Sequence, residues 1–147
     1  MNSRRPILVT GGCGFIGSNL VDALAARGEH VRVLDAMLRS GARENAQWLR
    51  ARHGKKVTID VADVRDVAAV ERAVSDAAGV LHLAGQVAVT TSLQDPVADF
   101  EINARGTLNI LEAVRRSDAS APILFASTNK VYGRLLDEDE IVIAGER

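Results

Sequence analysis

Three glycines, Gly11, Gly14 and Gly17, are the residues of this 147-residue sequence whose spacing first suggests a chemistry. They follow the apolar run 7–10 and precede a helical pattern, as in a strand, a tight turn and a helix that surround a pyrophosphate. Gly11 permits the tight turn, Gly14 permits close approach of the backbone to phosphates, and Gly17 permits the helix to pack on the strand. The free N–H groups and partial positive charge of a helix start favour an anion. The motif therefore predicts a dinucleotide-binding site.

An acidic residue, Asp35, ends the next apolar run, eighteen residues after Gly17. A carboxylate at this place can accept hydrogen bonds from both hydroxyls of an adenosine ribose, and its charge repels a 2′-phosphate. We therefore predict NAD as the cofactor. Arg39 leaves NADP open, because an arginine near the ribose can accommodate the extra phosphate. The alternatives, an ordinary glycine loop and a solvated acid, are disfavoured by the strand before the loop and the helix after it.

The elements that must position these residues alternate along the chain. Strands are predicted at 7–10, 30–34, 56–59, 80–83 and 123–126, and helices at 16–27, 44–52, 67–74 and 95–116. The residues spaced to face the sheet are Ile16, Leu20, Ala23 and Leu24 in the first helix, and Val97, Phe100, Ala104, Thr107, Leu111 and Val114 in the last. Strands separated by helices predict right-handed βαβ units. We expect an α/β fold, a Rossmann-type doubly wound parallel sheet of about five strands.

Composition excludes several classes of function. A formal net charge of −1 and a total of five aromatic residues give no sign of the basic surface that binds nucleic acid. No stretch approaches the roughly 20 apolar residues of a membrane span, and the run before Gly11 is too short for a signal peptide. A single cysteine, Cys13, excludes an internal disulfide. We predict a cytoplasmic protein without a metal site and without membrane partners.

Four blocks of sequence resemble the extended short-chain dehydrogenase/reductase family of nucleotide-sugar epimerases and dehydratases. They are residues 10–17, 63–64, 83–85 and 127–133. Within this family, residues 84–92, 99–115 and 128–133 are most similar to the CDP-paratose 2-epimerases, also called CDP-tyvelose epimerases. The likeness covers the whole chain but only the amino-terminal part of such an enzyme. We expect residues 1–147 to be one NAD-binding Rossmann domain, truncated and incomplete relative to the family, without its carboxy-terminal nucleotide-sugar-binding part.

The resemblance also implies roles for single residues. The implied cofactor residues are Gly11, Gly14, Phe15, Ile16 and Gly17 at the pyrophosphate, Asp35 at the ribose, Asp63 and Val64 at the adenine, and Leu83, Ala84 and Gly85 along the cofactor. The implied substrate side consists of Gln86, Asn129 and Lys130, with Thr128 as the catalytic hydroxyl that donates to the reacting sugar oxygen. Ala36 and Leu38 depart from the family, which commonly has Asn and Ser there.

Asn103 lies near the apolar face of the predicted helix 95–116. A buried amide needs partners, because leaving it unsatisfied costs on the order of 1–3 kcal/mol. We place Asn103 with the cofactor site, as a bridge that positions the strand beside it. The alternative is an asparagine at the helix edge that faces water.

The resemblance implies a catalytic Tyr-x-x-x-Lys pair that this sequence does not contain. The tyrosine would be the general base, and the lysine would lower its pKa. The single tyrosine here is Tyr132, and Leu136 stands four residues later. The favoured hypothesis is thus the cofactor part of an NAD-dependent nucleotide-sugar epimerase, which transiently oxidises a sugar carbon and is inactive alone.

Two alternatives stay open. The first is a piece of a 4,6-dehydratase, 4-epimerase or reductase on the same platform, and the second is a non-catalytic NAD-binding regulatory module. For the full-length enzyme, the resemblance implies a nucleotide-sugar substrate and a homodimer that forms through helix 95–116.

Overall fold

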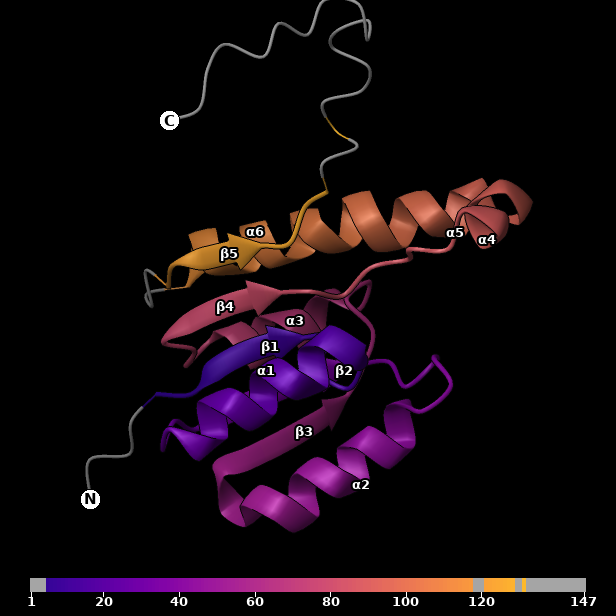
Figure 1. The fold of residues 1–147 in the computed structure, drawn as a ribbon. Helices are drawn as coiled ribbons and strands as arrows, with labels where there is room; N and C mark the ends of the chain where they lie inside the picture. The colour runs from indigo at the N-terminus through magenta and orange to yellow at the C-terminus, as the bar shows by residue number, and fades with distance from the viewer. Residues whose placement is uncertain (1–4, 118–120, 129–130, 132–147) are drawn as a thin grey trace, which may run out of the picture.

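The computed structural model describes residues 5–117, 121–128 and 131. Within them, five parallel strands form one sheet in the order β3-β2-β1-β4-β5 (Figure 1). The strands are β1 (Ile7–Thr10), β2 (Val31–Asp35), β3 (Val57–Val61), β4 (Gly79–His82) and β5 (Ile123–Phe125). The predicted parallel α/β sheet is confirmed. Because the chain order reverses between β1 and β4, the crevice for a ligand is expected at the carboxyl ends of these two strands.

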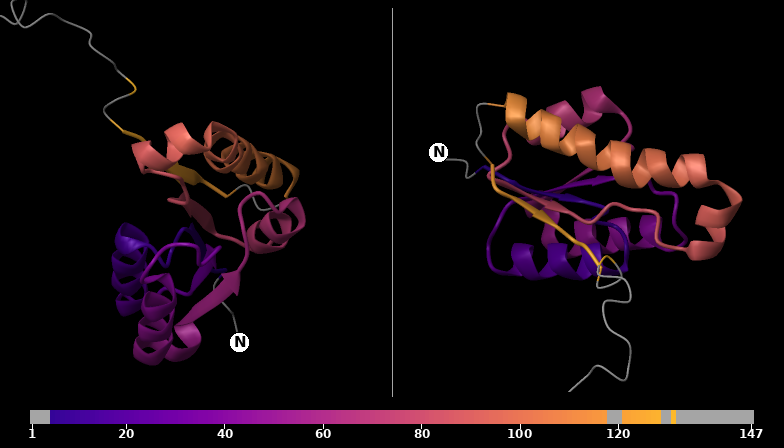
Figure 2. Two further views of the ribbon diagram at one scale, coloured as in Figure 1. Left: turned by 90° about the vertical axis from the view of Figure 1, so that its right-hand side faces the viewer. Right: turned by 90° about the horizontal axis from the view of Figure 1, so that it is seen from above.

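Helices cover both faces of the sheet (Figure 2). They are α1 (Phe15–Ala26), α2 (Ala42–His53), α3 (Val67–Val74), α4 (Val89–Gln94), α5 (Pro96–Phe100) and α6 (Gly106–Arg116), with a 3₁₀ turn at Gly54–Lys56 and a π-helical turn at Glu101–Arg105. Helices α1 and α2 lie on one face, and α3 and α6 lie on the other. The crossovers through α1, α2 and α6 connect neighbouring parallel strands, whereas the crossover through α3 passes from β3 at the edge of the sheet to β4 on the far side of β1.

The central strand β1 is buried on both faces. Leu8 packs into the core under α3 and α6, and Val9 packs into the core under α1 and α2, each with 0% exposure. Successive side chains of a strand point to opposite faces, so an uninterrupted apolar run fits a strand covered on both sides. The glycine turn thus begins at the end of a strand that is buried on both faces.

The inward stripe predicted for α1 is wrong for Ile16 and Ala23, whereas Leu24 is partly buried and packs against the core. Ile16 is 68% exposed, and Ala23 is exposed as well. The buried residues of this helix are Gly17, Ser18, Val21 and Ala25. The close approach of Gly17 to the glycine turn determines which side of the helix faces the sheet. Small residues therefore line the buried side, although larger apolar residues are available on α1.

The helix predicted at 95–116 is confirmed as helical from Pro96 to Arg116, but the π turn divides it. Several residues of its predicted inward face are exposed, among them Val97 at 69%, Phe100 at 56% and Leu111 at 47%. The buried residues of α6 are Gly106, Ile110 and Ala113. A π turn inserts an extra residue, which shifts the following helical face relative to regular α-helical spacing.

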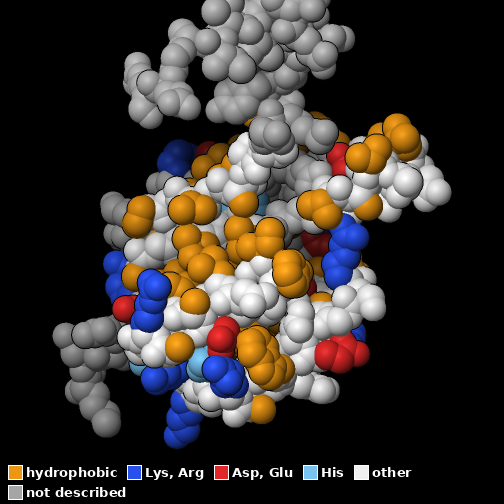
Figure 3. Space-filling view, in the orientation of Figure 1, with side chains coloured by type: hydrophobic (Ala, Val, Ile, Leu, Met, Phe, Trp, Pro, Cys, Tyr) orange, Lys and Arg blue, Asp and Glu red, His pale blue; other side chains and the backbone are white. Residues whose placement is uncertain are grey.

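An apolar groove lies beside α1, on the sheet face over β4 and β5 (Figure 3). Its volume is about 500 Å³, and its lining includes Ile7, Leu24, Leu81, Ile123 and Leu124. Faces of parallel sheets are normally covered by helices. No helix covers this groove within the described part of the chain.

Candidate cofactor-binding site

The predicted glycines form the turn between β1 and α1 at the carboxyl edge of the sheet. Gly11 has a φ of +68°, and a Cβ there would lie 2.8 Å from the backbone nitrogen of Ala84. A Cβ on Gly17 would lie 2.7 Å from the Cα of Gly12 and closer still to the carbonyl oxygen of Gly11. Neither glycine can carry a side chain without a shift of backbone. The turn, the helix and the loop after β4 are therefore packed together by glycine contacts.

Gly12 was not predicted as a functional residue, yet a Cβ there would also be crowded, in this case by a side chain. A Cβ on Gly12 would approach the Val33 side chain of β2 to 2.8 Å. The spacing pattern that identified the other three glycines does not include this position. Its requirement for glycine follows only from the packing of the turn against the neighbouring strand.

The amino terminus of α1 presents backbone rather than side chains to the crevice. Its N-cap is Gly14, with no side-chain cap and no acidic residue in the first turn. The side chains of Phe15 and Ile16 are 84% and 68% exposed, so at the pyrophosphate these residues could offer their backbone N–H groups. The first N–H groups of a helix have no partner within it and carry the positive end of the helix dipole. This end of α1 fits an anion.

The carboxylate of Asp35 ties the glycine turn to the end of β2. One oxygen accepts a hydrogen bond from the backbone N–H of Cys13 at 2.9 Å, and the other accepts from that of Met37 at 2.8 Å. Asn45 of α2 donates to the carbonyl of Cys13 at 2.9 Å, a contact that the sequence did not predict. An ionised carboxylate has about four acceptor sites. Asp35 can therefore anchor the turn and still accept from a ribose.

Arg39 does not pair with Asp35 in the structure. Its Nη2 donates to Oε1 of Gln86, in the loop after β4, at 2.5 Å. Because β1 lies between β2 and β4, this contact joins the two loops that flank the glycine turn. The contact associates Arg39 with a residue predicted on the substrate side rather than with the ribose carboxylate.

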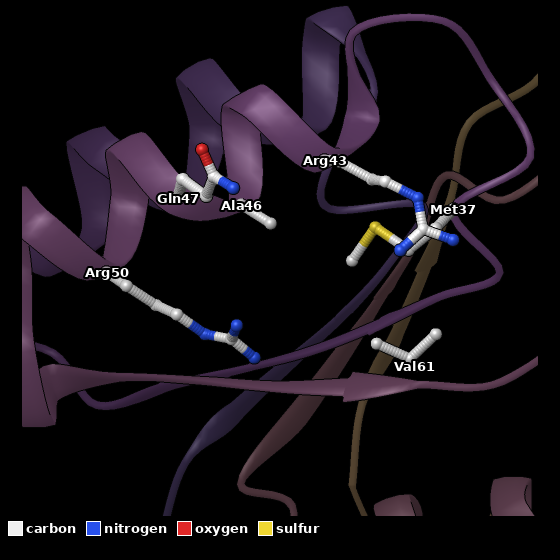
Figure 4. A pocket seen from close by; sticks show the side chains of 6 residues that line it. All are labelled: Met37, Arg43, Ala46, Gln47, Arg50 and Val61. Carbon is white, nitrogen blue, oxygen red and sulfur yellow. The ribbon is translucent and has the colours of Figure 1, made fainter.

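A second cavity lies between α2 and β3 (Figure 4). It has a volume of about 140 Å³ and is lined by Met37, Arg43, Ala46, Gln47, Arg50 and Val61. Small-molecule sites usually have volumes of about 300–1,000 Å³. Met37, with a φ of 57°, is the one non-glycine residue of the described chain with positive φ. The cavity is too small to hold a nucleoside, so we place the cofactor at the glycine turn.

Asp63 and Val64 follow β3, where the adenine was predicted. Both carboxylate oxygens of Asp63 accept from the Arg65 side chain, at 3.0 and 2.7 Å, and this contact lowers the pKa of Asp63. Val64 is 5% exposed and packs under α6, where a Cβ on Gly106 would lie 2.6 Å from its Cγ2. Val64 is therefore a core residue, and its backbone is the part that could meet an adenine. The sequence did not predict the contact between Arg65 and Asp63.

The loop after β4 is held by the side chain of Asn103. Its Oδ1 accepts from the backbone N–H of Gln86 at 2.8 Å, and its Nδ2 donates to the carbonyl of Gln86 at 3.0 Å. The same Nδ2 donates to Asp99 at 3.2 Å. The amide bridges the π turn and the loop, in contrast to the alternative in which it faces water. Leu83, Ala84 and Gly85 precede this anchored residue and are partly buried.

Thr128 follows β5 and is exposed. The strand order places it on the same side of β1 as the loop after β4. Asn129 and Lys130, predicted to face the substrate, lie outside the described residues. The roles of all three remain predictions.

Cys13 lies within the glycine turn but is fully buried. Burial, followed by the nearby charge of Asp35, raises the pKa of its thiol to about 12. The reactive form of cysteine is the thiolate. Cys13 is therefore an inert packing residue at neutral pH.

The described residues contain neither a membrane-spanning helix nor a cluster of metal ligands. Among residues 5–117, 121–128 and 131, the helices are too short or too polar to cross a bilayer. The same residues contain no group of three or more His, Cys, Asp or Glu side chains that could hold a metal ion.

Comparison with known proteins identifies the family. A sequence model of the GDP-mannose 4,6-dehydratase family matches residues 8–142. The CDP-paratose 2-epimerase of Salmonella typhi is 45% identical over 131 residues, which make up 88% of this chain and 38% of that protein. The dTDP-glucose 4,6-dehydratase of Mycolicibacterium smegmatis is 37% identical over 131 residues, with the same coverage of 88% and 38%.

A solved structure shows the same fold. The UDP-glucose 4-epimerase of Stenotrophomonas maltophila, crystallised with NAD and formylated UDP-arabinopyranose, matches with a TM-score of 0.77 and 28% identity. The match covers 88% of this chain and 38% of that one. The chain thus spans well under half the length of the proteins it matches.

Several solved UDP-glucose 4-epimerase structures that this chain matches contain NAD, and the residues present fit this cofactor. The glycine turn excludes side chains at Gly11 and Gly17, the start of α1 offers N–H groups, and Asp35 stands at the end of β2. The family match covers most of the sequence. The chain therefore belongs to the GDP-mannose 4,6-dehydratase family, whose members include NAD-dependent nucleotide-sugar epimerases and dehydratases.

Proposed function

We propose that this chain is the cofactor-binding part of an NAD-dependent nucleotide-sugar epimerase of the CDP-paratose 2-epimerase type, inactive by itself. The observation that carries the proposal is the glycine turn, where Gly11 and Gly17 have no room for a Cβ beside the bare amino terminus of α1. A pyrophosphate needs this close backbone approach. The 45% identity to a CDP-paratose 2-epimerase supports the choice of epimerase.

The chain would bind and orient both the cofactor and the sugar. The first turn of α1 would donate to the pyrophosphate, and Asp35 would accept from the adenosine ribose. When bound, NAD supplies a hydride acceptor that returns the hydride to the same sugar carbon. Thr128 would donate a hydrogen bond to the sugar oxygen as it becomes a carbonyl oxygen. Gln86, Asn129 and Lys130 would face the sugar.

The proton of the sugar hydroxyl would need a general base, and this sequence lacks the family's Tyr-x-x-x-Lys pair. We therefore expect binding without turnover. If the natural reading frame continues into that pair, the chain is part of an enzyme. If the frame ends after residue 147, that outcome supports the alternative hypothesis of a non-catalytic NAD-binding module.

A 4,6-dehydratase is the second candidate. It is supported by the 37% identity to a dTDP-glucose 4,6-dehydratase, which is lower than the identity to the epimerase. Both reactions begin with oxidation of the sugar by NAD, so the cofactor part alone serves either. Incubation of the full-length enzyme with CDP- and dTDP-hexoses separates them, because a dehydratase releases water and an epimerase does not.

Calorimetric titration of the chain with NAD tests the proposal directly. We expect saturable binding of NAD and weaker binding of NADP, because the charge of Asp35 repels a 2′-phosphate. Circular dichroism recorded on the same sample shows whether the chain is folded. A folded chain that binds neither dinucleotide would contradict the proposed function.

We also propose that two copies associate through the helical region 95–116. Its exposed apolar residues include Val97, Phe100, Leu108 and Leu111, at 69%, 56%, 50% and 47% exposure. Exposed apolar patches of more than a few hundred Å² tend to find partners. We expect a dimer by light scattering, and a monomer after Leu108→Glu. Leu124→Glu, in the groove on the opposite sheet face, is the control and should leave the dimer intact. A monomeric parent chain at high concentration would refute this interface.

A further inference from the structure

His82, the last residue of β4, is a buried histidine for which the proposed function has no role. It is 1% exposed, and its ring lies 5.7 Å from the ring of Phe125. Its Nδ1 is 2.6 Å from Oγ1 of Thr10, and its Nε2 is 3.0 Å from Oγ1 of Thr107. Both ring nitrogens therefore bond to hydroxyl groups, one on β1 and the other on α6.

The direction of each hydrogen bond in this series follows from the backbone groups at its two ends. The Thr107 hydroxyl donates to the backbone carbonyl of Asn103 at 2.6 Å, because a carbonyl can only accept. Its oxygen must therefore accept from His82, so Nε2 carries the hydrogen. Nδ1 then accepts from the hydroxyl of Thr10, whose oxygen accepts from the backbone N–H of Ala84 at 3.2 Å. Every donor meets an acceptor when the imidazole is neutral and protonated at Nε2.

Both ends of this chain of hydrogen bonds reach the loop that follows β4. One end is the N–H of Ala84, and the other is Asn103, whose side chain holds both backbone groups of Gln86. Between them lies Gly85, where a Cβ would stand 3.2 Å from Oδ1 of Asn103. The three residues of the loop are thus attached at both ends to one buried network.

The network also fastens the π turn. The backbone N–H of Gly106 bonds to the carbonyl of Glu101, five residues earlier, which is the defining bond of a π turn. Thr107, the second residue of α6, donates from its hydroxyl to the carbonyl of Asn103 in this turn. Turns of this kind are frequent at functional sites. Here the turn brings the amide of Asn103 to the backbone of Gln86.

We propose that His82, as the neutral tautomer protonated at Nε2, positions the loop Ala84–Gln86 against the cofactor by joining β1 to the π turn. The proposal rests on the NAD site proposed above. His82 is a positioning residue, because it acts through Thr10, Thr107 and Asn103. Its burial lowers the pKa of the imidazole, which agrees with an uncharged ring.

The tautomer can be measured without any cofactor. Long-range ¹⁵N–¹H NMR of the chain distinguishes a ring protonated at Nε2 from one protonated at Nδ1 and from the imidazolium. The sequence contains three histidines, and loss of one signal set in His82→Gln assigns the resonances. We expect a neutral ring protonated at Nε2 at pH 7. Either of the other two forms at pH 7 overturns the proposal, whether or not the chain binds NAD.

The coupling to the cofactor is tested with two substitutions of one residue. Thr107→Val keeps the shape of the side chain but removes its hydroxyl, and Thr107→Ser keeps the hydroxyl. The Val variant loses both hydrogen bonds of this hydroxyl, and we expect it to bind NAD at least about five-fold more weakly, whereas the Ser variant should bind like the parent. A Val variant with a lower Tm but unchanged NAD affinity overturns the proposal, since the network would then be only structural.

Failure of the proposed function has a separate signature. A folded parent chain that binds no NAD contradicts the cofactor site, and with it the coupling of His82 to that site. The NMR measurement would still report the tautomer in that case. The two results together show which of the two claims has failed.

Discussion

Replacement of Gly17 by alanine is expected to abolish NAD binding and to destabilise the domain. The new Cβ would meet the Cα of Gly12 at 2.7 Å and the carbonyl of Gly11 closer still, and both are backbone atoms that no rotamer change can move. Overpacking of this kind costs about 1–3 kcal/mol and sometimes more. Alanine recovers about 1 kcal/mol of helix propensity at most. Because the new Cβ meets backbone atoms, the cost lies at the upper end of this range, and we expect a net loss of about 2 kcal/mol together with displacement of the turn.

Gly14→Ala is the matched control for this substitution. Gly14 has φ −72° and ψ 178°, a conformation open to any residue, and a Cβ there would lie 3.3 Å from the carbonyl of Gly11. We expect its stability to stay within about 1 kcal/mol of the parent, since Ala replaces Gly at an N-cap. Its NAD affinity should nevertheless fall about ten-fold or more, because the methyl group would stand where the pyrophosphate approaches.

Chemical denaturation and NAD titration of the two variants separate folding from binding. The expected pattern is loss of both properties in Gly17→Ala and loss of binding with little loss of stability in Gly14→Ala. If Gly17→Ala were as stable as the parent and bound NAD normally, the packing described for the turn would be incorrect. Normal NAD binding by Gly14→Ala would remove the pyrophosphate from the amino terminus of α1.

Substitution of Asp35 by alanine should weaken NAD binding about 100-fold. The carboxylate would accept from the ribose while it holds the N–H groups of Cys13 and Met37 at 2.9 and 2.8 Å. Hydrogen bonds to a charged group contribute about 1.5–3 kcal/mol each, and 1.4 kcal/mol corresponds to a factor of ten. The same substitution should narrow the preference for NAD over NADP, because it removes the charge that repels a 2′-phosphate.

Asp60→Ala supplies the control for charge. Asp60 is an exposed carboxylate on β3 whose nearest cation, Arg32, lies 3.7 Å away, and exposed pairs of this kind contribute little to stability. The substitution Asp60→Ala removes one negative charge, as Asp35→Ala does, but it changes no contact of the glycine turn. Calorimetry with NAD and NADP compares the parent and both variants. Equal weakening of NAD binding by the two substitutions would mean that net charge, and not the position of Asp35, determines the affinity.

Local sequence was enough to predict the strands, the glycine turn and the acid at the end of β2. Strand and helix periodicities are set by neighbouring residues, and the turn needs glycine because of its own backbone geometry. The tight positions Gly11 and Gly17 could therefore be recognised by their spacing. Gly12 could not, because the atom that excludes its side chain belongs to Val33, on another strand.

Faces of helices were predicted less well than the helices themselves. The stripe of Ile16, Leu20, Ala23 and Leu24 was predicted to face the sheet, but the close contact of Gly17 with the turn leaves Ile16 and Ala23 exposed, and Leu24 only partly buried. In the last helix, the π turn shifted the buried face to Gly106, Ile110 and Ala113. Neither shift has a signal in hydrophobic periodicity, because both arise from contacts with other elements.

The sequence by itself determined the cofactor class, through glycines and an acid whose spacing has a direct physical meaning. Only the tertiary structure decided how the loops around the cofactor are held. It joined Arg39 to Gln86, Asn103 to the backbone of Gln86, and His82 to hydroxyl groups on two other elements. Such hydrogen bonds connect residues from 17 to 72 positions apart, and they form only when the parallel sheet brings the carboxyl ends of its strands to one edge.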